Sequence, residues 1–145
     1  MRIISLLSVI FLFCFSVCGQ TFNGKPYDLK KYNFEKENVL NVILNSPQFD
    51  SIYHSENVIF VETELLSKDT TLKLKRGNCK AKIKSKKELK ANEENVGLGD
   101  FTCDPNNMIR VRVQIENTLK HLLLNLGMEK VNGKWTIANH VIMEN

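Results

Sequence analysis

The chain lacks the short motifs that mark the common enzyme and cofactor classes. It has no Gly-x-Ser-x-Gly turn for a nucleophilic serine, no glycine-rich phosphate loop and no Cys-x-x-Cys redox pair. Its three histidines, His54, His121 and His140, are too widely spaced in sequence to form a metal-binding motif. We therefore predict no catalytic residue, no cofactor and no metal site, and we favour a protein that binds over one that catalyses.

Long hydrophobic runs are also missing, with one exception at the start of the chain. A positive charge at Arg2 precedes an apolar run from Ile3 to Cys18, which is shorter than the roughly 20 residues of a membrane span. No cluster of Lys or Arg follows it. This pattern predicts a signal peptide over residues 1–19, cleaved after Gly19. We expect an exported protein, periplasmic or secreted, whose mature chain has no transmembrane span.

A second processing route stays open. The segment Phe15-Ser16-Val17-Cys18 resembles the lipobox of bacterial lipoproteins, although Leu is usual in place of its Phe and Gly or Ala in place of its Val. Acylation at Cys18 would anchor the protein in the membrane, and the same domain would still lie outside the cytoplasm.

Cysteine is scarce, with four residues in the chain. Removal of residues 1–19 leaves only Cys79 and Cys103. Two cysteines in an exported protein are often paired, so a disulfide is predicted. Two separate buried thiols are the alternative.

The 126 residues after Gly19 are enough for one hydrophobic core, and no repeat or low-complexity segment divides them. Residues 20–32 are polar and predict a flexible lead-in to a single domain over 33–145. Asn33 is the predicted N-cap of a first helix. Its apolar stripe consists of Phe34, Leu40, Ile43 and Leu44. Ser46-Pro47 predicts the start of a short second helix.

Beyond the helices the apolar residues recur with a period of two, which predicts strands over 58–64, 79–83 and 109–115. Residues 86–92 predict a helical turn, and the glycines of 97–99 predict a loop.

The final hairpin is the clearest local prediction, because Asn132-Gly133 is the preferred pair for a type I′ turn. A regular ladder from this turn would pair Met128 with Ile137, Leu126 with Asn139, Leu124 with Val141 and Leu122 with Met143. One face of that hairpin is apolar and the other mixed. We therefore predict an α+β fold, in which the helix packs on one face of a curved antiparallel sheet of about four to six strands.

This order of elements, ending in a Lys-x-Asn-Gly-Lys-Trp-x-Ile hairpin over 130–137, resembles small exported bacterial proteins of the cystatin-like and NTF2-like superfold. The resemblance implies the fold class only, since that superfold includes enzymes, ligand-binding pockets and plain scaffolds. The Gln-x-Val-x-Gly loop of cystatin-type inhibitors does not occur, so protease inhibition is not implied.

Acidic residues are almost missing between Lys73 and Lys90, where nine basic residues accompany Glu88 alone. A turn at Gly77-Asn78 would place Lys75 opposite Lys80 and Lys73 opposite Lys82, and like charges in such pairs repel. The strand of Arg110 and Arg112 would widen this basic face if it lay beside it. The predicted face comprises Lys73, Lys75, Lys80, Lys82, Lys84, Arg110 and Arg112.

The preferred function for this face is contact with an anionic envelope component or a protein partner. A plain solvated face is the alternative, in which Glu93, Glu94 and other downstream acids neutralise the lysines. Nucleic acid is disfavoured because no exposed aromatic residues are interleaved with the lysines. A function of a different class is a small-ligand pocket or weakly recognisable enzyme of the NTF2-like type, with a cavity between helix and sheet.

Overall fold

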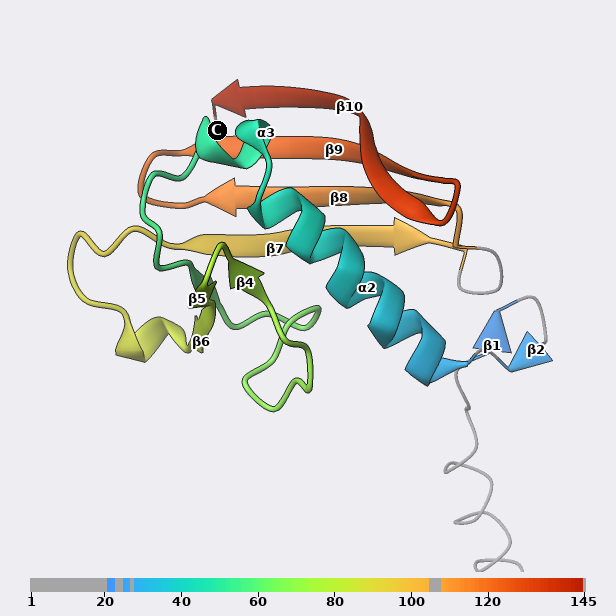
Figure 1. The fold of residues 1–145 in the computed structure, drawn as a ribbon. Helices are drawn as coiled ribbons and strands as arrows, with labels where there is room; N and C mark the ends of the chain where they lie inside the picture. Colours follow the sequence, from blue (N-terminus) through green and yellow to red (C-terminus); the bar gives the residue numbers. More distant parts are fainter. Residues whose placement is uncertain (1–20, 23–24, 27, 105–107, 145) are drawn as a thin grey trace, which may run out of the picture.

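The computed structural model describes residues 21–22, 25–26, 28–104 and 108–144. The predicted signal peptide over 1–19 and the possible lipidation site at Cys18 lie outside these residues. Within them, the chain is an α+β structure with one long helix on one face of a six-stranded sheet (Figure 1). The predicted α+β class, with a helix packed on a sheet, is confirmed.

Helix α2 (Leu29–Leu44) begins five residues before the predicted start, since its N-cap is Asp28 and not Asn33. Its N-cap is Asp28, whose carboxylate accepts a hydrogen bond from the Lys31 amide (3.1 Å), so the prediction of Asn33 was wrong. Residues 29–32 are accordingly helical and not part of a lead-in. Phe34 is 62% exposed, and the apolar stripe that faces the sheet consists of Val39, Leu40, Ile43 and Leu44.

The short second helix α3 (Pro47–Asp50) confirms its prediction. Ser46 is its N-cap and accepts from the amide of Phe49 (3.2 Å), while Pro47 occupies the first helical position. The predicted helical turn is also present, as the 3₁₀ helix η1 (Lys86–Glu88).

The main sheet has the strand order β10-β9-β8-β7-β3-β6. Its strands are β3 (Ile59–Val61), β6 (Lys82–Lys84), β7 (Val96–Cys103), β8 (Arg110–Asn117), β9 (Leu122–Val131) and β10 (Lys134–Glu144). The prediction of an antiparallel sheet was wrong in one respect, because β3 pairs in parallel with both β6 and β7. Two short hairpins, β1 (Thr21–Phe22) with β2 (Lys25–Pro26) and β4 (Lys75–Arg76) with β5 (Cys79–Lys80), lie outside this sheet.

The glycines of residues 97–99 lie inside β7 and do not form the predicted loop. The ladder between β7 and β8 shifts its register between Leu98 and Asp100, so Gly99 occupies a bulge. Gly99 also lies under a neighbouring side chain, since a Cβ there would come 2.9 Å from Oε1 of Gln114.

The predicted turn of the final hairpin is confirmed, with positive φ angles at Asn132 (50°) and Gly133 (78°). The pairing of Met128 with Ile137 is also confirmed. Beyond it a bulge at Ala138 shifts the register by one residue, so the other predicted pairs were wrong. The observed pairs are Leu126 with His140, Leu124 with Ile142 and Leu122 with Glu144. Beyond the bulge, Asn139 and Val141 lie on the face opposite α2 in place of His140, and Ala138 borders the same face.

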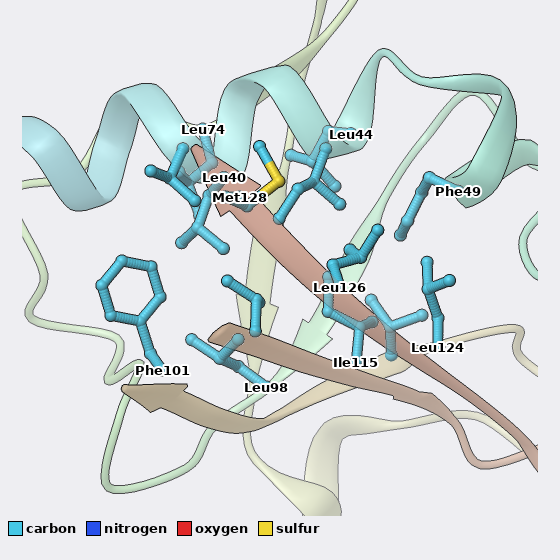
Figure 2. Close-up of a cluster of buried hydrophobic side chains, with 14 of the residues drawn as sticks. Leu40, Leu44, Phe49, Leu74, Leu98, Phe101, Ile115, Leu124, Leu126 and Met128 are labelled. Carbon is cyan, nitrogen blue, oxygen red and sulfur yellow. The ribbon is translucent and has the colours of Figure 1, made fainter. Parts of the chain in front are cut away.

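A continuous hydrophobic core fills the layer between α2 and the sheet. Figure 2 shows Leu40 and Leu44 of α2 above Leu98 and Leu126 of the strands, with Met128 between the two helix residues. All five side chains are at most 3% exposed. The pocket that the NTF2-like alternative requires between helix and sheet is therefore occupied by apolar side chains.

One buried polar cluster connects α2 to the final hairpin. Glu35, which is 5% exposed, accepts hydrogen bonds from Lys130 Nζ (2.5 Å) and from the indole N–H of Trp135 (2.7 Å). Burial alone would raise the pKa of Glu35. The hydrogen bonds from Lys130 and Trp135, with the positive charge of Lys130, outweigh that effect and hold the pKa below its usual value of 4.5. This charged contact fixes where the N-terminal half of α2 lies on the sheet.

Candidate functional site

The segment from Lys73 to Lys82, which we name the lysine hairpin, contains β4 and β5. Gly77 adopts a positive φ of 55° at the predicted turn, and Lys75 pairs with Lys80 as predicted. The predicted pairing of Lys73 with Lys82 was wrong. The chain leaves the hairpin at Ala81, whose amide donates to the Leu74 carbonyl, and Lys82 then pairs with Ile59 in the main sheet.

The backbone of the lysine hairpin is fastened to the side of α2 by two asparagines. Asn41 donates to the carbonyl of Lys73 (3.1 Å) and accepts from the amide of Lys75 (2.8 Å). Asn45 repeats this arrangement on the next residues, donating to the carbonyl of Lys75 (3.0 Å) and accepting from the amide of Gly77 (2.7 Å). The asparagines are four residues apart on one face of the helix. Their side-chain amides make the hydrogen bonds with the β4 backbone that a neighbouring strand would otherwise make.

Further contacts hold both ends of β4. Glu37 accepts from the amide of Lys73 (2.8 Å). At the other end, the guanidinium of Arg76 donates to Asp50 (2.5 Å) and to the carbonyl of Tyr53 (3.1 Å). The position of the hairpin is therefore set by its backbone and by Arg76, while the lysine side chains remain exposed. Figure 1 shows this hairpin beside the C-terminal half of α2.

Two of the nine basic residues between Lys73 and Lys90 are neutralised by acids. Arg76 pairs with Asp50, and Lys84 pairs with Glu93 (2.8 Å), where both side chains are mostly buried. Within the described part of the chain the other seven have no ion-pair partner: Lys73, Lys75, Lys80, Lys82, Lys86, Lys87 and Lys90. The internal neutralisation that the solvated-face alternative predicts is therefore present, but only in part.

Arg110 and Arg112 do not widen this basic face. They lie on β8, which is separated from β6 by β7 and β3. They also lie at the other end of the sheet. Arg112 pairs with Thr102, near the end of β7. Lys84 pairs with Val61 of β3, which pairs with Gly97 near the start of β7. Arg110 is paired with Glu129 (3.1 Å). The predicted face is thus two separate groups, the lysines and the two arginines.

The two arginines border a groove of about 790 Å³ on the sheet face opposite α2, which we name the open face. Residues from β7, β8, β9 and β10 line it, and about half of them are polar. Its polar lining residues, besides Arg110 and Glu129, are Asp100, Thr102, Arg112, Gln114, Asn125 and Asn139.

The structure does not bring Cys79 and Cys103 together, and both are free thiols. In β7, Cys103 follows Val96 by seven residues, which is about 23 Å along a strand. Strand β6 runs parallel to β3, as β7 does, and begins at Lys82. Cys79 precedes Lys82 in the chain, so it lies towards the end of the sheet where β7 starts, away from Cys103. A disulfide requires Cα atoms within about 7 Å, so it does not form in this arrangement.

Lys36 is a buried cation that sequence reasoning missed. It is 6% exposed, its Nζ donates to the carbonyl of Leu65 (2.5 Å), and it lies 5.3 Å from the ring centre of Phe101. Burial lowers the pKa of Lys36, and the nearby Cys103 opposes this weakly. Its ammonium has no ion-pair partner within the described part of the chain, so the Leu65 carbonyl and the Phe101 ring hold it.

Residues 21–22, 25–26, 28–104 and 108–144 contain no group of three His, Cys, Asp or Glu side chains able to hold a metal ion. The same residues include no helix both long and apolar enough to cross a membrane. Comparison of the chain with protein-family models, curated proteins and solved structures finds no match.

Proposed function

We propose that the protein is an exported, non-catalytic binding protein of the bacterial cell envelope, whose lysine hairpin contacts an anionic envelope component. Export follows from the signal peptide predicted over residues 1–19. The binding role follows from the lysine hairpin, where Lys73, Lys75, Lys80 and Lys82 are exposed and have no ion-pair partner in the described part of the chain.

The observation that carries this proposal is the cross-strand pair of Lys75 and Lys80. Directly opposed like charges destabilise a hairpin by about 0.2–1 kcal/mol. Here the pair is held in place by Asn41 and Asn45, so the backbone cannot relax by changing register. An anion bound between the two ammonium groups would convert this repulsion into attraction.

Preorganisation supports the same conclusion. Flexible loops lose conformational entropy when they bind, which weakens their affinity. Lys73 and Lys75 project from a backbone that α2 already holds, so only their side chains must be ordered by a partner. Each lysine near an anionic surface contributes about 1 kcal/mol, so the hairpin supplies several kcal/mol in total.

The test is co-sedimentation of the processed protein with lipid vesicles. Vesicles containing phosphatidylglycerol supply the anionic surface, and vesicles of phosphatidylcholine alone are the matched control. We expect binding to the anionic vesicles only. It should weaken steeply as salt is raised from about 0.1 M to about 1 M, because the screening length falls from about 10 Å to about 3 Å.

Three results would contradict the proposal. They are equal binding to both vesicle types, binding to anionic vesicles that is unchanged in high salt, and no binding even at low salt. The last result would leave the lysine hairpin as a solvated face that deters contact between sheet edges.

A further inference from the structure

The groove on the open face of the sheet has a regular construction that is independent of the lysine hairpin. One row of paired residues crosses four strands in the order Thr102, Arg112, Gly127 and Asn139. The next row consists of Asp100, Gln114, Asn125 and Val141. The groove of about 790 Å³ lies over these two rows and is large enough for a small organic ligand.

Gly127 gives this surface its shape. A Cβ at this position would come 2.5 Å from Oδ1 of Asn139, so any larger residue would displace that side chain. Asn139 therefore lies flat across β9, in the direction of Arg112 on the next strand. The bulge at Ala138 is what turns Asn139 to this face.

Most polar groups around the groove already have partners. Arg110 donates to Glu129 (3.1 Å), and Thr102 donates to Asp100 (2.6 Å). Gln114 donates to Asn125 (2.9 Å), across the same two strands as Arg110 and Glu129.

Arg112 and Asn139 differ from these neighbours. Neither side chain has a hydrogen-bond or ion-pair partner in the described part of the chain. Arg112 presents five N–H groups in a planar fork, and Asn139 adds an amide donor and an acceptor. The groove thus has an unpaired cation and an unpaired amide on the two strands that flank Gly127.

We propose that this groove binds a carboxylate that carries an adjacent amide group, such as the carboxyl end of a short peptide. The carboxylate lies against Arg112, whose fork matches its two oxygens, and accepts a further hydrogen bond from Asn139. The paired amides of Gln114 and Asn125 keep donor and acceptor capacity for the neighbouring peptide group of the ligand.

The charges around the groove favour a carboxylate over a phosphate. Glu129 already neutralises Arg110, and Asp100 lies one row from Arg112. A single negative charge is balanced by Arg112, whereas the second charge of a phosphate would face Asp100 and Glu129 without a free cation.

The test is titration of the processed protein with N-acetyl-alanyl-alanine, followed by backbone NMR shifts. We expect saturable shifts on β8, β9 and β10, with a dissociation constant in the millimolar range or below. Arg112→Gln should weaken binding by about 10- to 100-fold, since a charge-assisted bidentate contact is lost. Lys134→Gln, which removes one positive charge from the exposed turn, is the matched control and should bind as the parent does.

Two further ligands make the result decisive. The C-terminal amide of the same dipeptide should bind at least about tenfold more weakly, because it lacks the charge. Inorganic phosphate should not displace the dipeptide at equal concentration. Equal binding of the amide, displacement by phosphate, equal weakening by Lys134→Gln, or no shift in the parent protein would each overturn the proposal. Variants of the lysine hairpin should leave this binding unchanged, so the proposal can fail independently of the proposed function.

Discussion

The buried contact between Glu35, Lys130 and Trp135 offers the sharpest test of how α2 is held on the sheet. Glu35→Gln keeps the shape of the side chain and one oxygen for the indole N–H of Trp135, but it removes the charge-assisted bond to Lys130. Such bonds contribute about 1.5–3 kcal/mol. The Lys130 side chain is 25% exposed and can recover contact with water, so we expect a loss of about 1.5–2 kcal/mol.

Urea unfolding measures this loss directly. Trp135 is the only tryptophan and is 7% exposed, so its fluorescence reports unfolding, with far-UV circular dichroism as a second probe. We expect a lower midpoint at an unchanged m-value, and a melting temperature reduced by about 5–10 °C. Glu56→Gln, at an exposed site, is the matched control and should stay within about 0.5 kcal/mol of the parent protein.

The pH dependence gives the same prediction a second, independent readout. The folded pKa of Glu35 lies below its usual value of 4.5, so its contribution is complete above that pH and is lost as the pH falls through the folded pKa. The gap in unfolding free energy between parent and Glu35→Gln should therefore narrow as the pH falls below about 4.5. A variant as stable as the parent near neutral pH, or a gap that does not change in acid, would refute this account of the cluster.

Three further predictions concern other buried or docking groups. Asn117→Ala should lower the free energy of unfolding, measured in urea, by about 2–4 kcal/mol. The fully buried amide of Asn117 donates to the carbonyl of Ile52 (2.7 Å), which would lose its partner. A loss below about 1 kcal/mol would contradict this. Lys36→Met should be as stable as the parent or up to about 1 kcal/mol more stable near neutral pH, because it removes a buried charge. Since the folded pKa of Lys36 is lowered, the parent should gain stability as the pH rises from the folded pKa towards 10.5, and the variant should not. Asn41→Ala with Asn45→Ala should weaken binding to anionic vesicles by about 3- to 10-fold without changing any charge, and unchanged binding would show that docking of the hairpin is irrelevant.

Local signals in the sequence were sufficient for several elements of the fold. Ser46-Pro47, Asn132-Gly133 and Gly77-Asn78 each restrict the backbone strongly over a few residues, and all three turns or caps were predicted in the right place. The start of α2 was missed because Asp28 and Asn33 are both good N-caps, and a single sequence does not rank them.

The misplaced features depend on long-range pairing. The bulge at Ala138 and the strand character of residues 97–99 follow from pairing with β9 and β8, which no local pattern specifies. The parallel position of β3 between β6 and β7 is likewise a property of the whole sheet. For this reason Arg112 was grouped with the lysines although the fold separates them.

One available signal was overlooked in the candidate site. Glu37, Asn41 and Asn45 recur every four residues and so share one face of a helix. Polar side chains in such a row can form hydrogen bonds with the backbone of another segment as well as with water. It could have indicated that α2 docks an extended segment, although not that the segment is the lysine hairpin.

The central claim is that the lysine hairpin, and not the overall positive charge, binds the anionic surface. The most direct measurement compares two charge-matched variants on phosphatidylglycerol vesicles at low salt. Lys75→Gln with Lys80→Gln removes two charges from the hairpin, and Lys30→Gln with Lys134→Gln removes two exposed charges elsewhere. At about 1 kcal/mol per lysine, the hairpin variant should bind about 30-fold more weakly than the parent, and the control variant within about threefold of it. Equal weakening of both variants would contradict the claim.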